Sequence, residues 1–524
     1  MPAHVERLIA ELSDPGKYPH APQSVRVVQT HISVVFIAGD LVYKVKKPVD
    51  FGFLDFSTRE KRRHFCRQEV LLNSRFSEGL YLGVVPIHEG PDGINLHGKG
   101  REIDTAVVMR RVPQDRLLVH LLEDDRVTPE LLDRLSDRLA AIHSEAPTSL
   151  HIARHGAFEV LRLNLKENFE QTYRHVGRTV DQRTRQEVFN RSMDFLHGHK
   201  RLFHDRVSAG HIRDCHGDLH LDHVIIEDGI YLFDCIEFNE RFRFCDTASD
   251  LSFLLMDMDF RGYPAFSHRI SHRYVETSGD REALRLAGFY KSYRAYIRGK
   301  VAGFAMDEHE VSLPDKRVAV RSAKHYFALA LAYLEAPPPP VLVITVGLMG
   351  TGKSYVAEAL GTRLGTAPVR SDVIRKELHQ IAPELHQFEP FRRGIYGEES
   401  TDRTYRAMCE IAEARLIRGE PVILDASFSR REHRDEAFRV AQSAGARFRI
   451  VLCTCPESTV RERLTARMGS AGEPSDGRWE LFHAQKALFE PPEPLEQRYC
   501  RTWDSTSDRN DFLRELVREL MIPD

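Results

Sequence analysis

The stretch Gly347-Leu-Met-Gly-Thr-Gly-Lys-Ser354 decides the fold of the C-terminal part of this 524-residue chain. It follows the β-branched apolar run VLVITV (341–346), which predicts a buried strand, and precedes YVAEALGTRL, which has helical periodicity. A strand, a G-x-x-x-x-G-K-[ST] loop and a helix in this order are typical of a phosphate-binding loop. Its glycines allow successive backbone N–H groups to face phosphate oxygens at the positive end of the helix.

The residues of this loop are expected to bind ATP and Mg²⁺. Lys353 is expected to reach the β- and γ-phosphates and to act in catalysis, and the Ser354 hydroxyl is expected to ligate magnesium. The residues expected to bind ATP here are Gly347, Leu348, Met349, Gly350, Thr351, Gly352, Lys353, Ser354 and Tyr355.

Two further segments favour phosphoryl transfer to a hydroxyl group. The apolar strand Pro421-Val-Ile-Leu-Asp425 ends in a carboxylate suited to the magnesium shell. Asp372 stands where the helix VIRKEL begins, so it is either a helix cap or the base that orients the acceptor hydroxyl. Arg370 or Arg375 is then expected to hold the acceptor.

A third segment predicts a lid helix. Val460, Leu464 and Met468 form an apolar stripe, and Arg463 and Arg467 lie four residues apart on a neighbouring face. Two such arginines can close over the transferring phosphoryl group and stabilise its developing negative charge. The alternative is a solvated helix face with ordinary arginines.

Together, GLMGTGKS, RSDVIRKEL, VILDASFSRREHR and RERLTARM resemble the small P-loop kinases related to zeta toxins, gluconate-kinase-like enzymes and the kinase part of polynucleotide kinases. The resemblance covers about residues 341–504. It implies an α/β three-layer P-loop NTPase domain with a parallel sheet. It also implies that Asp372 acts on the acceptor hydroxyl and that Arg463 and Arg467 contact the ATP phosphates.

The N-terminal half carries a different pattern, IRDCHGDLHLDH (212–223), which first suggests a metal site because it gathers histidines and acids. The next residues change this interpretation. Short apolar strands at 224–226 and 231–233, joined by Glu-Asp-Gly-Ile, predict a hairpin, and Asp234 follows it directly. This order, with Asp218 before the hairpin and Asp234 after it, is typical of protein-kinase-like phosphotransferases.

Upstream segments fit the same layout. Strands at 33–37 and 41–45 predict a hairpin that places Lys44 in its second strand, and a helix beginning near Cys66 offers Glu69 as the ion-pair partner of that lysine. Lys46 lies on the same strand face and is the rival candidate. Lys44 is preferred because an apolar residue follows it.

This layout resembles the aminoglycoside phosphotransferase-like kinases over about residues 24–304, with HGDLH as the most specific motif. It is closest to the bacterial family in which such a domain is fused to a small P-loop kinase, since KKPVDFGFLDFS (46–57) looks like the N-lobe of that family. The resemblance implies an α+β bilobal protein-kinase-like domain. It makes Asp218 the catalytic base, Asp234 a magnesium ligand, and Lys44 with Glu69 the pair that positions ATP.

One residue departs from the family pattern. The family supplies Asn five residues after the catalytic Asp to bind a second magnesium ion, and this chain has His223 there. Mg²⁺ prefers oxygen ligands, so an imidazole is a poor replacement. His223 is kept as a candidate metal ligand, and Asp222 and Glu237 are the alternative oxygen donors. Otherwise the domain binds one metal, turns over slowly or only binds a ligand.

Four prolines at 337–340 predict a stiff spacer and therefore a domain boundary. We expect domains at 1–335 and 341–524, with 336–340 as the linker. A net charge of −3 excludes a global field for nucleic acid or membranes. The sequence shows no signal peptide and no apolar span, and its eight scattered cysteines are expected to be buried and reduced, which favours the cytoplasm.

The leading hypothesis is a bifunctional kinase that uses ATP and Mg²⁺ in both domains and phosphorylates hydroxyl-bearing small molecules. In one alternative, the N-terminal domain is a non-catalytic sensor that regulates the P-loop kinase. In another, the C-terminal domain is a 5′-hydroxyl polynucleotide kinase or a zeta-toxin-like nucleotide-sugar kinase, which local basic stretches such as RREHR (430–434) permit. Nucleic acid is the less favoured partner.

Overall fold

The computed structural model describes residues 3–98, 100–304, 306–307, 311–382, 385–387, 389–390, 392–467 and 476–522. Its contacts divide the chain into two compact units. One consists of Met1–Asp257 and His268–Leu334, and the other of Met258–Ser267 and Glu335–Asp524. Residues 258–267 thus group with the second unit, whereas the domain boundaries expected from the sequence run continuously to the proline segment.

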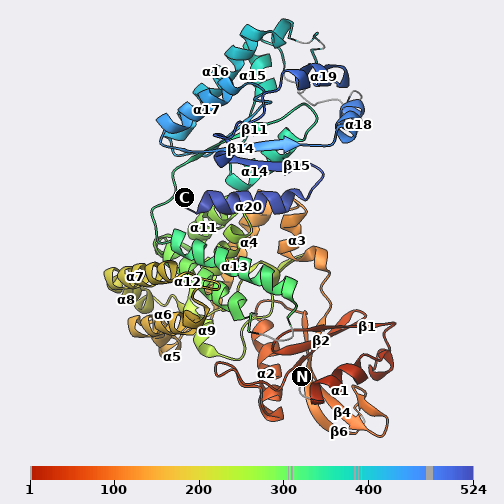
Figure 1. Ribbon diagram of the computed structural model, residues 1–524. Helices are drawn as coiled ribbons and strands as arrows, with labels where there is room; N and C mark the ends of the chain where they lie inside the picture. The colour runs from red at the N-terminus through yellow and green to blue at the C-terminus, as the bar shows by residue number, and fades with distance from the viewer. Residues whose placement is uncertain are drawn as a thin grey trace. The chain divides into compact units, whose positions relative to one another are not determined.

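The first unit begins with a six-stranded antiparallel sheet in the order β1-β2-β3-β6-β4-β5 (Figure 1). The elements of this part are α1 (Ala3–Leu12), β1 (Val25–Gln29), β2 (Ser33–Ala38), β3 (Leu41–Lys46), α2 (Arg59–Asn73), β4 (Tyr81–Gly90), β5 (Gly93–Asn95) and β6 (Arg101–Arg110). The hairpin expected around Gly39–Asp40 is confirmed, with Ser33 paired to Lys46 and Ala38 paired to Leu41.

Strand alternation decides what each face of β3 contacts. Tyr43 and Val45 join the apolar core that α1 covers. Lys44 and Lys46 therefore point to the opposite face, where both reach Glu69 of α2. Because side chains alternate between the two faces of a strand, both candidate lysines face the same helix, α2.

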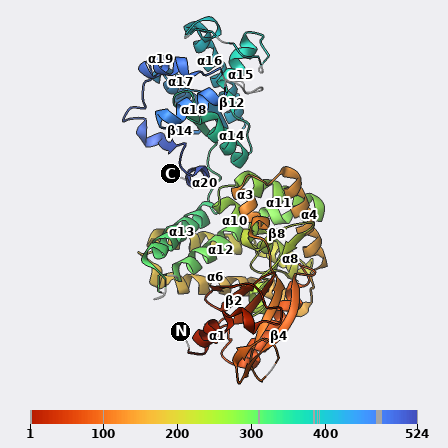
Figure 2. The same cartoon turned by 90° about the vertical axis from the view of Figure 1, so that its right-hand side faces the viewer.

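The rest of this unit is mostly helical. Its helices are α3 (Leu118–Glu123), α4 (Pro129–Glu145), α5 (Leu150–Ala153), α6 (Phe158–Thr172), α7 (Gln182–Gly198), α8 (Lys200–Ser208), α9 (Glu240–Arg243), α10 (Thr247–Phe260), α11 (Pro264–Ser278), α12 (Glu282–Phe304) and α13 (Leu313–Ala332). The last residues of α10 and the first of α11 fall within residues 258–267, which group with the second unit. The helices α12 and α13 run alongside each other, as Figure 2 shows.

Two short strand pairs frame the HGDLH segment. They are β7 (Ile212–Asp214) with β10 (Phe244–Asp246), and β8 (Val224–Ile226) with β9 (Ile230–Leu232). The expected hairpin therefore exists, but its second strand begins and ends one residue earlier than predicted. Phe233 lies just beyond the strand, and its N–H still donates to the carbonyl oxygen of His223, 3.1 Å away, in the register of the hairpin.

The second unit is built on a parallel sheet in the order β12-β13-β11-β14-β15 (Figure 1). Its elements are β11 (Val341–Val346), α14 (Lys353–Leu364), β12 (Val369–Arg370), α15 (Ser371–Leu378), α16 (Glu398–Ile417), β13 (Val422–Asp425), α17 (Arg431–Ser443), β14 (Arg447–Thr454), α18 (Glu457–Arg467), α19 (Trp479–Ala487), β15 (Cys500–Asp504) and α20 (Arg509–Met521).

The central strand β11 is buried on both faces, which explains its unbroken apolar run. Leu342, Ile344 and Val346 pack in one core with α16 and α17. Val341 and Val343 pack in the other core with α14 and α20. The result is three layers of helix, sheet and helix, so the predicted fold class of this part is confirmed, as is the α+β class of the first unit.

All eight cysteines are free thiols, and five of them are buried. Cys245, Cys455 and Cys500 are only partly buried, so the expectation of buried thiols was too general. Among the described residues, no helix combines the length and the apolar character that a membrane span requires.

Candidate active sites

The loop that carries Asp218 is held by side chains far away in the sequence. The backbone N–H groups of His216 and Gly217 donate to the Asp250 carboxylate of α10 at 3.1 and 2.8 Å. Arg294 of α12 donates to the Gly217 carbonyl at 3.0 Å. Gly217 has φ +84°, and a Cβ there would lie 3.0 Å from the Phe242 carbonyl oxygen, so only glycine fits this turn.

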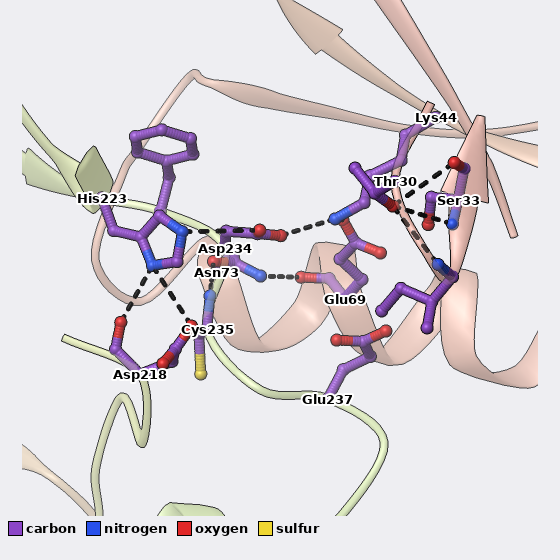
Figure 3. Close-up of polar contacts among 12 residues, drawn as sticks. Thr30, Ser33, Lys44, Glu69, Asn73, Asp218, His223, Asp234, Cys235 and Glu237 are labelled. Carbon is purple, nitrogen blue, oxygen red and sulfur yellow. Dashed lines mark hydrogen bonds and ion pairs between the residues drawn. The ribbon is translucent and has the colours of Figure 1, made fainter. Parts of the chain in front are cut away.

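Lys44, Glu69 and Asp234 form one connected ion-pair group (Figure 3). The Lys44 Nζ lies 2.9 Å from Glu69 Oε1 and 2.5 Å from Asp234 Oδ1. Burial opposes the charge on Lys44, but Asp234 and Glu69 outweigh it and hold the pKa of Lys44 well above its ordinary value. The lysine is therefore charged and connects the sheet to the segment after the hairpin.

The rival lysine occupies a different environment. The Lys46 side chain is fully buried, its Nζ lies 2.6 Å from Glu69 Oε2, and it also contacts Glu237. Lys44 keeps 15% of its side-chain surface exposed and reaches Asp234. Lys44 is therefore the more exposed lysine and pairs with Asp234, whereas the buried Lys46 pairs with Glu69 and Glu237.

Asp234 adopts a backbone conformation that is rare for a residue with a side chain. Its φ is +61°, in the left-handed region, and its N–H donates to the Tyr81 hydroxyl at 3.1 Å. The next residue, Cys235, donates its N–H to the side-chain oxygen of Asn73 at 2.8 Å. Strained residues of this kind are found at functional sites, where neighbouring contacts hold them in place.

The imidazole of His223 lies between the two acids, Asp218 and Asp234 (Figure 3). Its Nδ1 is 2.9 Å from the Asp218 carbonyl oxygen, and its Nε2 is 3.7 Å from Asp234 Oδ2. The alternative oxygen donors lie elsewhere: Glu237 contacts Lys46, and Asp222 lies 3.3 Å from His220 Nδ1.

His220, to which the sequence analysis assigns no role, is the closest histidine partner of the Asp218 carboxylate. Its Nε2 lies 3.6 Å from Asp218 Oδ2. Burial disfavours a charged His220, but the Asp218 carboxylate outweighs this and raises the pKa of His220 to about 9. Burial and the nearby His220 lower the pKa of His223 to about 4. At neutral pH, His220 is therefore charged and keeps Asp218 ionised, whereas His223 is neutral.

In the second unit, the loop after β11 has the backbone that its glycines require. Gly347 has φ +149°, and a Cβ there would lie 2.5 Å from the Cys453 carbonyl oxygen of β14. Gly350 and Gly352 have φ +78° and +93°. Lys353 begins α14, and its Nζ donates to the Leu348 carbonyl oxygen at 2.8 Å. The lysine therefore lies over the loop whose backbone is expected to hold phosphates.

A cavity of about 590 Å³ joins this loop to the two predicted acids. Lys353 and Ser354 line it beside Asp372 and Asp425. The other lining residues come from α15, α16, α17, α19 and neighbouring segments, among them Arg375, Tyr396, Arg430, His433 and Arg478. The structure thus brings the phosphate-binding loop, a metal-type carboxylate and a candidate base to one space large enough for a small ligand.

Asp425 ends β13, and Thr345 of β11 donates its hydroxyl to Asp425 Oδ1 at 3.1 Å. Asp372 lies in the first turn of α15, but Arg370 is the N-cap residue and no side chain caps this helix. The cap interpretation of Asp372 was therefore wrong. Burial is the main cause that raises the pKa of Asp372, and the Asp425 carboxylate adds to it.

The structure also separates the two candidate acceptor arginines. Arg370 lies 3.2 Å from Glu358 and 3.7 Å from Asp425 Oδ2. Arg375 is buried, lines the cavity, and donates to the Ile395 carbonyl oxygen and the Thr401 hydroxyl at 3.0 and 3.2 Å. Of the two, Arg375 is the arginine among the residues that line the cavity.

The remaining candidates are Arg463, Arg467 and Tyr355. Arg463 of α18 donates to the Ser505 hydroxyl at 2.6 Å and to the Gly350 carbonyl oxygen at 3.4 Å. Arg467 is the last residue of α18, and its side chain lies outside the described residues, as does Met468. The Tyr355 ring is exposed and lies under the Arg509 guanidinium at 4.3 Å, so its ring contacts an arginine outside the loop.

Comparison with known protein families assigns both halves. The family model described as "Phosphotransferase enzyme family" matches residues 83–287, which include Asp218, His223 and Asp234. The family model described as "AAA domain" matches residues 342–492, which include the glycine-rich loop, Asp372 and Asp425. This chain joins a phosphotransferase-family domain to a P-loop kinase-like domain. It is a phosphotransferase, and the two parts are called the phosphotransferase domain and the P-loop domain below.

Two relatives match this chain over most of its length and of their own. An uncharacterised protein of Mycobacterium tuberculosis (strain ATCC 25618 / H37Rv) is 28% identical over 464 residues, which cover 88% of this chain and 90% of that protein. An uncharacterised protein of Mycobacterium bovis matches with the same values. The similarity therefore extends across both domains.

Two solved structures match parts of the chain. A choline/ethanolamine kinase family protein from Mesorhizobium loti is 12% identical with a TM-score of 0.37, covering 64% of this chain and 99% of that one. The Mycobacterium tuberculosis APS kinase CysC is 20% identical with a TM-score of 0.27, covering 35% of this chain and 99% of that one.

Proposed function

We propose that this chain is a bifunctional, ATP-dependent phosphotransferase in which each domain transfers the γ-phosphoryl group of ATP to a hydroxyl acceptor. The observation that carries the proposal is that each unit gathers its own lysine, candidate base and metal-type carboxylate. Lys44, Asp218 and Asp234 are connected through contacts in one unit, and Lys353, Asp372 and Asp425 line one cavity in the other.

In the phosphotransferase domain, Lys44 is fixed by Glu69 and presents its ammonium group to the nucleotide phosphates. Asp218 is partly exposed and accepts the proton of the acceptor hydroxyl, and the charged His220 keeps it ionised. The Asp234 carboxylate has the oxygen donors that Mg²⁺ prefers and would hold the ion. A bound divalent cation would neutralise charge that develops on the phosphates.

In the P-loop domain, the backbone of the glycine-rich loop and Lys353 bind the phosphates, and Arg463 adds positive charge beside Gly350. The Ser354 hydroxyl and the Asp425 carboxylate fit the oxygen preference of Mg²⁺ and would hold it together. Asp372 accepts the proton of an acceptor hydroxyl in the cavity, while Arg375 orients the acceptor.

The proposal is tested by phosphoryl transfer from radiolabelled ATP to a panel of hydroxyl compounds, among them sugars, amino alcohols, nucleosides and oligonucleotides with a 5′-hydroxyl. The full chain is expected to yield products at two independent sites. A double variant with Asp218→Asn and Lys353→Ala is expected to yield none. Products that persist in the double variant would place the chemistry elsewhere. Labelling of oligonucleotides would favour the polynucleotide-kinase alternative.

As the pH is lowered, the reaction of the P-loop domain is expected to slow down at a higher pH than it would with an aspartate base of ordinary pKa. A base must be ionised, and burial raises the pKa of Asp372 above the usual value of about 4. Hence kcat/KM should be level at high pH and fall as the pH drops through this raised pKa. The shift is measured from kcat/KM as a function of pH, for the acceptor whose phosphorylation requires Lys353.

Two variants of α15 separate this base from a general effect of charge. Asp372→Asn is expected to remove the acid limb and to lower kcat/KM by about 10²–10⁴. Glu377 is an exposed residue of the same helix, and Glu377→Gln should leave the acid limb and kcat/KM unchanged. If Asp372→Asn kept the wild-type rate and acid limb, another group would be the base.

A further inference from the structure

The position of His223 bears on which metal ion the phosphotransferase domain uses. His223 ends the turn Leu221–His223, and its ring faces the acids on either side of the hairpin (Figure 3). This inference rests on the proposed function, since it concerns the cation that would accompany the nucleotide there.

An imidazole binds a metal ion in its neutral form, and the hydrogen bond of Nδ1 determines which tautomer that form takes here. Nδ1 lies 2.9 Å from the Asp218 carbonyl oxygen, which can only accept, so Nδ1 carries the hydrogen. Nε2 then has a lone pair. Histidine ligands of metal ions are commonly oriented in this way, with the other ring nitrogen donating to a carbonyl oxygen.

This lone pair faces a carboxylate oxygen at a distance suited to a shared ion. His223 Nε2 lies 3.7 Å from Asp234 Oδ2, which is longer than a hydrogen bond. Bonds of about 2.0–2.2 Å to one cation would allow two ligand atoms to stand about this far apart. The other oxygen, Asp234 Oδ1, is bound by Lys44, so Oδ2 is the oxygen directed toward the ring.

The neighbouring oxygen donors do not replace the missing amide. Glu237 lies against Lys46, and Asp222 lies beside His220. The donor set next to the base therefore contains one imidazole nitrogen and one carboxylate oxygen. Mg²⁺ favours oxygen alone, whereas first-row transition ions accept nitrogen readily.

We propose that His223 Nε2 and Asp234 Oδ2 together bind a first-row transition-metal dication, so that the phosphotransferase domain prefers Mn²⁺ or a later ion of that series to Mg²⁺. In this respect the residue that departs from the family pattern changes the choice of metal rather than removing the site. The histidine acts as a ligand through Nε2, and the Asp218 carbonyl orients it.

Mn²⁺ is the probe for the test, because pulsed electron paramagnetic resonance detects a nitrogen nucleus bound to it. The full chain carries Lys353→Ala to suppress nucleotide binding in the P-loop domain, and Mn²⁺ is added with a non-hydrolysable ATP analogue. We expect nitrogen coupling from an imidazole ligand. His223→Asn should remove this coupling and lower the affinity for Mn²⁺ relative to Mg²⁺ about tenfold or more.

Two further variants control the result. His197→Asn changes an exposed histidine of α7 and should leave the nitrogen coupling intact. His223→Gln supplies an amide oxygen on a longer side chain and should also lack the coupling. The midpoint of thermal unfolding of each variant shows whether the variant folds. The metal measurements are interpreted for the His223 variant whose midpoint equals that of the wild-type protein.

The failures of the two proposals are distinguishable. Suppose that Mn²⁺ binds together with the nucleotide in the protein that retains His223, but that no nitrogen coupling is seen. This result would overturn the assignment of His223 as a ligand and would leave the metal–nucleotide site intact. If neither Mn²⁺ nor Mg²⁺ bound with the nucleotide, the metal inference and the kinase function of this domain would fall together. An unchanged preference between Mn²⁺ and Mg²⁺ after His223→Asn would also overturn the metal inference.

Discussion

Replacing Lys353 with alanine is expected to lower kcat/KM of the P-loop domain by at least about 10²–10³, the loss found when one fixed group that stabilises transition-state charge is removed. The Lys353 ammonium lies over the loop carbonyl of Leu348 and lines the same cavity as Asp372. The other residues of GLMGTGKS are uncharged, so the loop itself offers no second cation to replace the lysine.

The measurement is the transfer rate to the acceptor of the P-loop domain, with the rate of the other domain recorded in the same preparation. Lys486→Ala is the matched control, because Lys486 is an exposed lysine of α19 that pairs with Glu457. Transfer by the phosphotransferase domain should stay unchanged in both variants. A Lys353→Ala protein with wild-type kcat/KM would contradict the assigned role.

Replacing Asp218 with asparagine is expected to lower kcat/KM of the phosphotransferase domain by about 10²–10⁴, the usual contribution of a general base. The amide keeps the shape of the side chain but cannot accept the acceptor proton. It also removes the negative charge that raises the pKa of His220 to about 9, so this pKa should fall.

These two effects give two independent measurements, a transfer rate and the titration of His220 followed by nuclear magnetic resonance. Asp228→Asn, at the exposed tip of the β8–β9 hairpin, is the matched control and should alter neither. If Asp218→Asn lowered the pKa of His220 but left every transfer and nucleotide-turnover rate unchanged, the domain would be a non-catalytic sensor rather than a kinase.

Several features could be predicted because they depend on residues close together in the chain. The loop from Gly347 to Ser354 needs only its glycines, the apolar run before it and the helical periodicity after it. The hairpins around Gly39 and Gly229 likewise follow from turn residues between short apolar runs. The predicted bounds of β9 differ by one residue from those in the structure, because a strand of three residues specifies its own ends only weakly.

Other features depend on residues that meet only in the folded chain. Strand periodicity places Lys44 and Lys46 on one face, but only their contacts separate the partly exposed lysine beside Asp234 from the buried one beside Glu237. The choice between Arg370 and Arg375 was likewise open until the cavity lining separated them. Local spacing cannot make such a distinction, because both members of each pair have the same chemistry.

The sequence alone thus determined that the chain has two phosphate-transfer motifs of different kinds, since each motif is encoded by short-range spacing. Only the tertiary structure decided where His223 and His220 lie relative to the two acids. Asp250, thirty-four residues after His216, fixes the loop that holds Asp218. That loop in turn directs His223 Nε2 toward Asp234 and sets His220 against the base. Burial and the nearby Asp218 carboxylate, which meet these histidines only on folding, shift the pKa values of His220 and His223 in opposite directions.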